Sequence, residues 1–237
     1  MHRDIVWITG ASRGIGREVA IQFARRGCIV CLSGRSIAQL KELAGQIVSD
    51  GGHAFVFPMD MRKQEDIPRV VASINKTVGR VDVLVNNAGI TAFKSIVKTS
   101  AKEFQEIISV NLISQILCTK AVLNDMVKRK SGLIFNILSR AAIKTFEDSG
   151  AYTASKAGMH GFGKVLRQEL RSSGIRVTNV LPGPTETDMW STGARKKFGH
   201  RMMKASSVAE AIVAVYMLPA DVVVDDIMLR PMLGDID

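Results

Sequence analysis

Short apolar runs alternate with longer segments of helical periodicity along most of the chain. The apolar runs predict strands at residues 6–8, 28–32, 53–57, 81–85, 133–137, 177–181 and 227–229. Apolar residues spaced three or four positions apart predict helices at 14–26, 38–48, 67–78, 101–109, 112–128, 152–171 and 208–217. Strands that are apolar throughout are typical of a parallel sheet covered on both faces. The pattern therefore predicts an α/β fold with three layers, a doubly wound parallel sheet between two layers of helices.

The order of these elements also predicts the domain organisation. No Pro-, Gly- or Ser-rich linker divides the 237 residues, so we expect a single domain over residues 1–237. Residues 183–207 are polar and show no clear apolar period before Val208. Ligands of open parallel sheets bind outside the carboxyl ends of the strands, where this segment follows the strand at 177–181. We therefore predict a substrate loop at about 183–207.

Composition narrows the class of protein. Apolar residues make up 46% and charged residues 23%, which excludes a disordered chain and a disulfide-stapled small domain. Lys and Arg number 32 against 22 Asp and Glu, giving a net charge of +10, and this excess suggests an anionic partner. Nucleic acid is disfavoured because the basic residues are scattered and no recognition module interrupts the α/β order.

The three cysteines predict neither a disulfide framework nor a metal site. Cys28 and Cys31 are three residues apart in a run that reads as a buried strand, so their side chains point to opposite faces. We predict that these two and Cys118 are buried thiols. No signal-peptide pattern follows Met1, and no stretch approaches the roughly 18 apolar residues that span a membrane. We therefore expect a cytoplasmic protein without membrane association.

A glycine-rich turn provides the signal for a cofactor. Gly10, Gly14 and Gly16 directly follow the first strand and open the first helix. Such a turn brings the backbone close to a pyrophosphate and points the helix N-terminus at the anion. The second strand ends in Leu-Ser-Gly-Arg without the acidic residue typical of NAD binding, and Arg35 and Arg13 can hold a 2′-phosphate instead. The sequence therefore favours NADP(H), although two solvated surface arginines remain an alternative.

Tyr152 and Lys156 lie four residues apart on one face of a predicted helix. A nearby ammonium stabilises a phenolate, so we expect Lys156 to lower the pKa of Tyr152 and to make it an acid–base group near neutrality. Ser139 ends the strand at 133–137, where its hydroxyl can bind the same oxygen. Alone, a Tyr-x3-Lys pair is a weak signal, because many helices carry one as a surface contact.

Together these segments resemble the short-chain dehydrogenase/reductase family over essentially the whole chain. The resemblance implies a Rossmann fold. The matching segments are Thr9-Gly10-x3-Gly14-x-Gly16, Asp60, Asn86-Asn87-Ala88-Gly89, Asn111, Ser139, Tyr152-x3-Lys156 and Pro182-Gly183.

The resemblance also implies roles for individual residues. Tyr152 would donate the proton to the carbonyl oxygen, Ser139 would orient the carbonyl, Lys156 would bind the nicotinamide ribose, and Asn111 would hold a water linked to Lys156. The expected cofactor-binding residues are Gly10, Ser12, Arg13, Gly14, Ile15, Gly16, Arg35, Asp60, Met61, Asn87, Ala88, Gly89, Tyr152, Lys156, Pro182, Gly183, Thr185 and Thr187. Thr185 departs from the family pattern, which has an apolar residue there. Because that position contacts the nicotinamide carboxamide mainly through its backbone, we expect cofactor binding to be retained.

Substrate and partners are less defined by the sequence. The expected pocket lining is Phe93, Ala141, Ala142, Phe146, Met189 and Trp190, although apolar residues in these segments are as often plain core. The chain resembles 3-oxoacyl-(acyl-carrier-protein) reductases about as well as NADP-dependent carbonyl reductases. In the former branch, acyl carrier protein would dock at Arg129 and Arg171. The resemblance also implies a homodimer or homotetramer.

Three functional hypotheses follow. The first is an NADPH-dependent reductase that converts a ketone or 3-oxoacyl group to a secondary alcohol. The second is an NADP-dependent dehydrogenase that oxidises a small alcohol or hydroxy acid. The third, from another class, is a non-catalytic nucleotide-binding regulator, which would be expected to lose Tyr, Lys or Ser, all of which are present here.

Overall fold

A parallel sheet of seven strands forms the centre of the computed structural model, which describes residues 3–234 and 236. Residues 1, 2, 235 and 237 of the predicted 1–237 domain lie outside the described part. The strand order is β3-β2-β1-β4-β5-β6-β9. The strands are β1 (Ile5–Thr9), β2 (Ile29–Ser33), β3 (His53–Val56), β4 (Val83–Asn86), β5 (Gly132–Ile137), β6 (Ile175–Pro182) and β9 (Asp226–Leu229). The chain thus winds outward in both directions from β1 and β4, and the predicted doubly wound sheet is confirmed.

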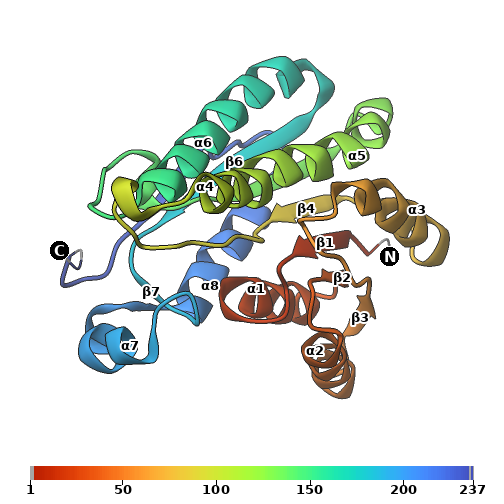
Figure 1. Ribbon diagram of the computed structural model, residues 1–237. Helices are drawn as coiled ribbons and strands as arrows, with labels where there is room; N and C mark the ends of the chain where they lie inside the picture. Colours follow the sequence, from red (N-terminus) through yellow and green to blue (C-terminus); the bar gives the residue numbers. More distant parts are fainter. Residues whose placement is uncertain (1–2, 235, 237) are drawn as a thin grey trace.

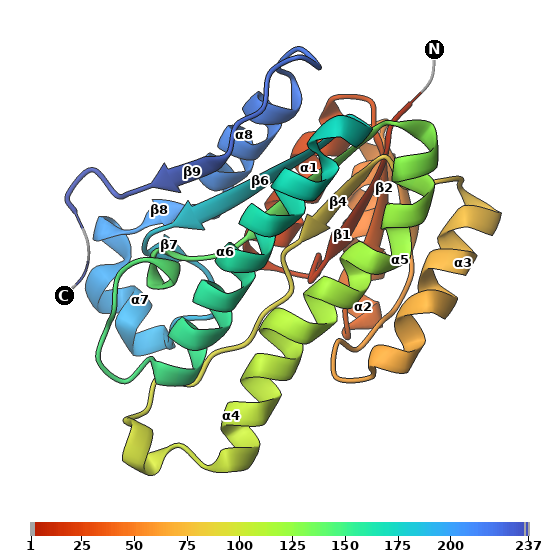
Figure 2. The ribbon, with the colours of Figure 1, turned by 90° about the horizontal axis from the view of Figure 1, so that it is seen from above.

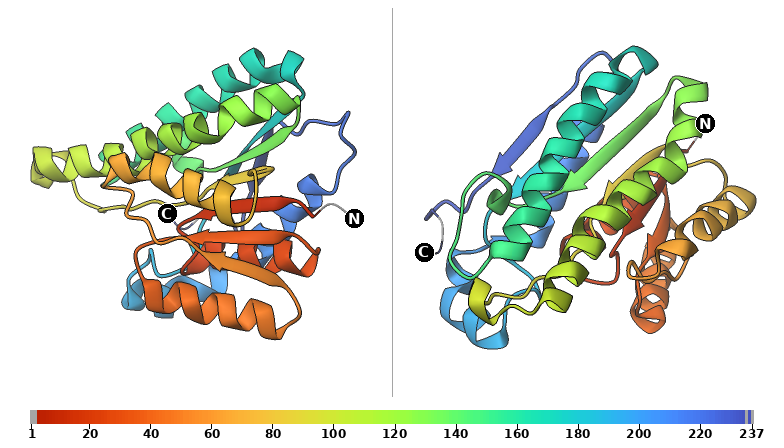
Figure 3. Two further views of the ribbon diagram at one scale, coloured as in Figure 1. Left: turned by 90° about the vertical axis from the view of Figure 1, so that its right-hand side faces the viewer. Right: turned by 45° about the horizontal axis from the view of Figure 1, so that its top comes forward.

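Helices cover both faces of this sheet, as Figures 1 and 3 show. One layer contains α1 (Gly14–Arg25), α2 (Ile37–Ser49) and α8 (Ala205–Tyr216). The other contains α3 (Ile67–Thr77), α4 (Ala101–Ile108), α5 (Ser114–Arg129) and α6 (Gly150–Leu170). The three-layer prediction is therefore confirmed, with most element ends within two or three residues of those expected from the sequence.

Alternation along the strands separates the core into two parts. In β1, Val6 and Ile8 pack against the α1 layer, whereas Ile5 and Trp7 pack against the α3 layer. Cys28 just precedes β2 and belongs to the first core, while Cys31 belongs to the second. Both are free and buried, as is Cys118, and the described residues hold no cluster of His, Cys, Asp and Glu suited to a metal. The prediction of three buried thiols is confirmed.

The two helices expected at 101–109 and 112–128 form one continuous helical segment. A π-helical turn, Ser109–Ile113, joins α4 to α5. By length and composition, Ala101–Arg129 is apolar enough to cross a membrane, contrary to the expectation from the sequence. The core helix of a folded domain passes the same test, and α5 buries Cys118, Val122 and Met126 against the sheet layer, so this segment is weak evidence for a membrane span.

The segment 183–207 contains more regular structure than its polar sequence predicted. Strands β7 (Thr185–Glu186) and β8 (Met203–Lys204) pair in a small separate sheet, and α7 (Thr192–Phe198) lies between them. Figure 2 shows this segment beside the end of β6. Because α7 buries none of its residues, it needs no apolar stripe, and the sequence carries no periodic signal for it.

A ladder of polar side chains crosses the sheet at one register position. Asn86, Asn136, Asn179 and Asp226 are paired neighbours on β4, β5, β6 and β9. Their side chains are hydrogen-bonded in sequence, at donor–acceptor distances of 3.1, 3.0 and 3.0 Å. A Cβ atom on Gly163 of α6 would overlap the Asn179 oxygen, so glycine leaves the space for this ladder.

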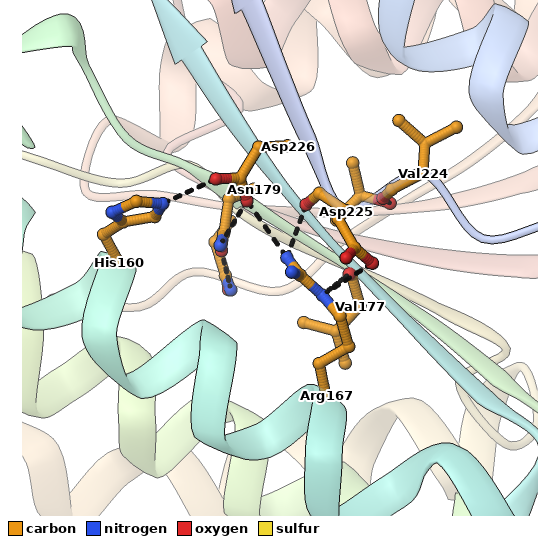
Figure 4. A network of polar contacts seen from close by, with 9 residues as sticks. His160, Arg167, Val177, Asn179, Val224, Asp225 and Asp226 are labelled. Carbon is orange, nitrogen blue, oxygen red and sulfur yellow. Dashed lines mark hydrogen bonds and ion pairs between the residues drawn. The ribbon is translucent and has the colours of Figure 1, made fainter. Parts of the chain in front are cut away.

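Two side chains of α6 hold the outer end of the ladder (Figure 4). His160 contacts Asp226 at 2.7 Å, and Arg167 donates to Asp226 at 3.1 Å and to the Val177 carbonyl at 3.0 Å. Arg167 also forms an ion pair with Asp225 at 3.2 Å. These contacts fix the position of α6, the helix that carries Tyr152 and Lys156, on the sheet.

Candidate active site

A cleft of about 1230 Å³ lies at the carboxyl ends of the central strands. It reaches from the turn after β1 and the end of β2 to the start of α6 and the 183–207 segment. This is the place at which the strand order reverses, where open α/β sheets bind ligands. The cleft therefore joins the predicted cofactor-binding residues and the predicted catalytic residues in one continuous space.

The glycine-rich turn packs closely against the residues that follow β4. Gly10 has a φ of +66°, and a Cβ atom there would lie 2.8 Å from the Ala88 Cα. Asn87 Nδ2 donates to the carbonyls of Thr9 and Gly10 at 2.9 and 3.0 Å, and Thr9 Oγ1 accepts from the backbone N–H groups of Asn87 and Ala88. Asn87 thus holds the turn in place.

The start of α1 suits an anion. No acidic residue occupies its first turn and no side chain caps it, so its free N–H groups face the cleft uncompensated. Gly14 and Ile15 line the cleft, whereas Gly16 does not. Gly16 lies beneath the turn, where a Cβ atom would overlap Asn87 Nδ2 and the Gly10 carbonyl. Gly16 therefore allows close packing of the turn, and its contact with the cofactor stays a prediction.

Two arginines at the rim of the cleft lack protein partners. Arg13 and Arg35 are exposed, line the cleft and form no side-chain hydrogen bond or ion pair with the described residues. Unpaired guanidinium groups beside a helix N-terminus fit a phosphate group. This arrangement agrees with the expectation that these two residues bind a 2′-phosphate.

A third arginine, Arg62, lines the same end of the cleft and was not predicted from the sequence. Arg62 donates from Nε to Asp60 Oδ1 at 3.1 Å and from Nη2 to Asp60 Oδ2 at 2.6 Å. These hydrogen bonds, assisted by the charge of Arg35, hold the pKa of Asp60 below its usual range. Arg62 follows β3 closely, so the rule that ligands gather at the carboxyl ends of strands was the signal that could have found it.

Tyr152 and Ser139 meet at the catalytic end of the cleft. Tyr152 lies in the first turn of α6, is buried, and forms a hydrogen bond with Ser139, which follows β5. Ser139 Oγ also accepts from the Ala141 N–H at 3.1 Å, which fixes the hydroxyl beside the cleft. The two residues thus offer adjacent hydroxyl groups to one ligand oxygen.

Lys156 lies one turn further along α6 and faces the same space. Its Nζ is 5.7 Å from the centre of the Tyr152 ring and donates to the Ile137 carbonyl at 2.8 Å. Gly89, which also lines the cleft, lies beside this ammonium: a Cβ atom there would be 3.7 Å from Nζ.

Burial alters the acidity of both groups. It raises the pKa of Tyr152 to about 12, opposed by the Ser139 hydrogen bond, and lowers the pKa of Lys156 to about 8. The expected lowering of the Tyr152 pKa by Lys156 is therefore wrong for the chain alone. The desolvation of a phenolate outweighs an ammonium that is itself buried and bound to a carbonyl. At neutral pH Tyr152 is protonated, the state required of a proton donor.

Asn111 lies behind the cleft wall rather than in it. It occupies the π-helical turn and is only 1% exposed. Its Oδ1 accepts from the Ile90 N–H at 2.8 Å, and its Nδ2 donates to the Ile90 carbonyl at 2.8 Å and to Ser155 Oγ at 3.1 Å. The side-chain amide thus joins the segment after β4 to α6, and its role in holding a water linked to Lys156 stays a prediction.

The cleft contains most of the remaining predicted residues. Those that line it are Ser12, Met61, Asn87, Ala88, Gly89, Phe93, Ala141, Phe146, Pro182, Gly183, Thr185, Thr187, Met189 and Trp190. Ala142 does not line it but packs against Leu138, Met159 and Leu181, so its assignment to the pocket is wrong. The sequence also missed Thr91, whose hydroxyl is buried in the cleft wall without a hydrogen-bond partner among the described residues. Such orphaned polar atoms are common where a ligand supplies the partner.

The residues expected to dock a carrier protein lie elsewhere. Arg129 donates to Asp82 at 2.6 Å and to the Val81 carbonyl at 2.7 Å, just before β4 begins. It therefore braces the amino end of the sheet, opposite the cleft, and its guanidinium is engaged within the chain. Arg171, by contrast, is exposed.

The lowered pKa of Lys156 predicts how any reaction in which Tyr152 donates its proton depends on pH. We expect kcat/KM to be constant below about pH 8 and to fall roughly tenfold per pH unit above it. Tyr152 remains protonated throughout, whereas Lys156 loses the charge that favours the phenolate left after proton donation. The variant Lys164→Gln, altered on the exposed face of α6, is the control, and its dependence of kcat/KM on pH should match that of the unmodified chain. A plateau that extends to pH 10 would contradict the assignment.

The fold and the cleft define the class of this protein. It is a doubly wound, dinucleotide-binding domain with Ser139, Tyr152 and Lys156 gathered where the strand order of the sheet reverses. The family model described as short chain dehydrogenase matches residues 4–197. The chain belongs to the short-chain dehydrogenase family.

Relatives of known name cover nearly the whole chain. It is 33% identical to a sepiapterin reductase of Chlorobaculum tepidum, over 99% of this chain and 98% of the relative. It is 36% identical to a 3-oxoacyl-[acyl-carrier-protein] reductase of Synechocystis, over 78% and 76% of the two chains. The crystal structure of an alcohol dehydrogenase from Thermococcus sibiricus, complexed with 5-hydroxy-NADP, is similar with a TM-score of 0.91 and 28% identity over all of both chains. The chain is therefore an oxidoreductase of this family.

Proposed function

We propose that the chain is an NADPH-dependent reductase that converts a ketone to a secondary alcohol. The observation that carries the proposal is the hydrogen-bonded Tyr152–Ser139 pair beside Lys156, in one cleft with the glycine-rich turn. Two of the named relatives are reductases, and the Thermococcus structure contains an NADP derivative. Together with Arg13 and Arg35, these comparisons support NADP(H) as the cofactor.

In this proposal a bound NADPH supplies the hydride, and the residues of the chain handle the carbonyl oxygen and the proton. The helix α1 N-terminus, Arg13 and Arg35 bind the phosphates. Ser139 and Tyr152 donate hydrogen bonds to the carbonyl oxygen, which aligns and polarises the C=O bond. Tyr152 then gives up its proton as the alcohol forms, and the Lys156 ammonium stabilises the phenolate until solvent returns a proton.

Reduction is favoured over oxidation by the relatives rather than by these groups. Tyr152 would act as the acid in reduction and, as its phenolate, as the base in oxidation, so one site can serve both directions. Two of the named relatives are reductases, which supports reduction, and an NADP-dependent dehydrogenase is the second hypothesis. A non-catalytic regulator is disfavoured because the three groups needed for proton transfer lie in contact with one cleft.

The oligomeric state and the substrate carrier are part of the same proposal. We expect a homodimer or homotetramer, as the family resemblance implies. A 3-oxoacyl group carried by acyl carrier protein is less favoured than a small ketone, since Arg129 is already bound to Asp82 and Val81. A direct comparison of acetoacetyl-carrier protein with a free ketone as substrate distinguishes the two.

The cofactor preference can be tested at Arg35. We expect Arg35→Ala to raise the KM for NADPH by about 10- to 100-fold, since a charge-assisted hydrogen bond contributes about 1.5–3 kcal/mol. The KM for NADH should change little, because NADH carries no 2′-phosphate. Arg25→Ala, at the exposed far end of α1, is the matched control and should leave both constants unchanged. Equal use of NADH and NADPH, with no effect of Arg35→Ala, would refute the assignment.

A further inference from the structure

Three aromatic rings from different parts of the chain form one wall of the cleft. Phe93 follows β4, Tyr152 belongs to α6 and Trp190 follows β7, and all three line the cleft. The centres of the Phe93 and Trp190 rings are 5.8 Å apart with their planes inclined by 27°, a stacked arrangement. The Phe93 ring lies 6.5 Å from the Tyr152 ring at 56°. The wall therefore runs without a break from Trp190 to the catalytic tyrosine.

This wall does not serve the hydrophobic core. Phe93 is 51% exposed and neighbouring Met189 is 40% exposed, although burying such side chains would stabilise the fold by about 1.5–3 kcal/mol each. The chain is also poor in aromatic residues, which make up 5% of it, and its other tryptophan, Trp7, is fully buried in the core. A half-exposed Phe93 and a partly exposed Trp190 beside the Tyr152 hydroxyl are best explained by a ligand that covers them.

The geometry of the wall defines what such a ligand must look like. Rings attract other flat rings through offset or tilted stacking, which contributes about 0.5–1.5 kcal/mol per pair beyond the area buried. The ligand carbonyl must reach Tyr152, and the centre of the Phe93 ring lies only 6.5 Å from the centre of the Tyr152 ring. A ring within one or two bonds of the carbonyl carbon could therefore pack on this wall, whereas an acyl chain could cover the wall only by apolar contact, without the stacking contribution.

We propose that the substrate is a ketone bearing a flat aromatic ring next to its carbonyl group, which the Phe93–Trp190 wall recognises by stacking. This inference rests on the proposed ketone reductase function and specifies its substrate class. Met189 flanks the wall and supplies a polarisable thioether edge for the same ring. Phe93 and Trp190 are thus specificity residues for the reaction.

The experiment compares two ketones of similar size, acetophenone and cyclohexyl methyl ketone, which differ in whether the ring is flat. With NADPH, we measure kcat/KM for acetophenone divided by kcat/KM for cyclohexyl methyl ketone. We expect this ratio to fall by about tenfold in the double variant Phe93→Leu, Trp190→Leu, since two stacking contacts of this kind contribute about 1.4 kcal/mol together. Phe104→Leu, on α4 and outside the cleft, is the matched control and should leave the ratio unchanged. An unchanged ratio in the double variant overturns the proposal.

A second measurement uses the unmodified chain, so that a failure of the variant to fold does not decide the question. We expect 1-phenylethanol to inhibit reduction of a common ketone at a several-fold lower concentration than 1-cyclohexylethanol, because only the former stacks on the wall. Equal inhibition by the two alcohols overturns the proposal. If no ketone of either type leads to NADPH oxidation, the proposed function itself fails, which is a distinct result from turnover without aromatic preference.

Discussion

Replacement of Tyr152 by phenylalanine is expected to lower kcat for ketone reduction by about 10²- to 10⁴-fold, the usual contribution of a positioned general acid. The substitution removes one oxygen atom and keeps the ring that packs beside Phe93. The Ser139 hydroxyl remains, but its ordinary acidity does not allow it to deliver a proton as the hydride arrives. The substrate KM should change far less than kcat, because Ser139 still donates a hydrogen bond to the carbonyl oxygen, and the binding of NADPH should change little because its phosphates bind elsewhere in the cleft.

The chain offers a close control for this experiment, since it contains only two tyrosines. The hydroxyl of Tyr216 on α8 donates to Asp4 at 2.8 Å and lies outside the cleft. Tyr216→Phe removes the same atom and should cost roughly 1 kcal/mol of stability while kcat is retained. Single-turnover NADPH absorbance measures the chemical step in both variants. A Tyr152→Phe variant that reduces an active ketone at the unmodified rate would show that another group supplies the proton.

Replacement of Arg167 by methionine should destabilise the fold by about 3 kcal/mol, the scale on which a buried, hydrogen-bonded charge is lost. Arg167 is 7% exposed and binds the Val177 carbonyl, Asp225 and Asp226. Methionine fills much of the volume but leaves the buried carbonyl unpaired and the two carboxylates without their cation. For a chain of this length we expect the Tm to fall by about 6–12 °C.

Arg171→Met, one turn beyond and exposed, is the matched control and should change stability by about 0.5 kcal/mol or less. The Tm of each variant, measured by thermal unfolding, shows whether stability is lost with the specific contacts of Arg167 or with any positive charge. Equal Tm values for the two variants would contradict the role assigned to Arg167.

Lowering the pH provides an independent test of the same network. Burial alone would raise the pKa of Asp226, but hydrogen bonds from His160, Asn179 and Arg167 together hold it below its usual range. A depressed carboxyl pKa contributes stability that is complete above the pKa of the unfolded chain and is lost as the pH falls through the folded value. The stability difference between the unmodified chain and Arg167→Met should therefore shrink in acid.

Local patterns in the sequence were sufficient for the fold and for much of the site. Apolar runs and helical spacing follow from which face of each element is buried, so the order of strands and helices could be predicted. The glycine-rich turn requires a positive φ at Gly10, which is a property of one residue. Tyr152 and Lys156 share a helix face because four residues make about one turn. Ser139, by contrast, was placed with them through its position at a strand end and through the family resemblance.

Contacts between segments distant in the sequence determined the positions of several residues that the sequence alone could not predict. Three residues lie behind the cleft because of segments distant in the sequence: Gly16, Asn111 and Ala142. Gly16 packs against Asn87, Asn111 is hydrogen-bonded to Ile90, and Ala142 packs against Leu138, Met159 and Leu181. The engagement of Arg129 with Asp82 joins residues 47 positions apart, and no local pattern encodes it. The small sheet in residues 183–207 forms without any periodic signal, since α7 buries nothing.

The sequence by itself determined the class of chemistry: a dinucleotide turn, a Ser–Tyr–Lys set and a sheet to hold them. Only the tertiary structure decided how acidic those groups are, because desolvation depends on everything packed around Tyr152 and Lys156 rather than on their spacing. It also brought Phe93 and Trp190, almost a hundred residues apart, into one stacked wall. Spacing along the chain fixes which groups one element presents, whereas burial and substrate recognition arise where separate elements meet.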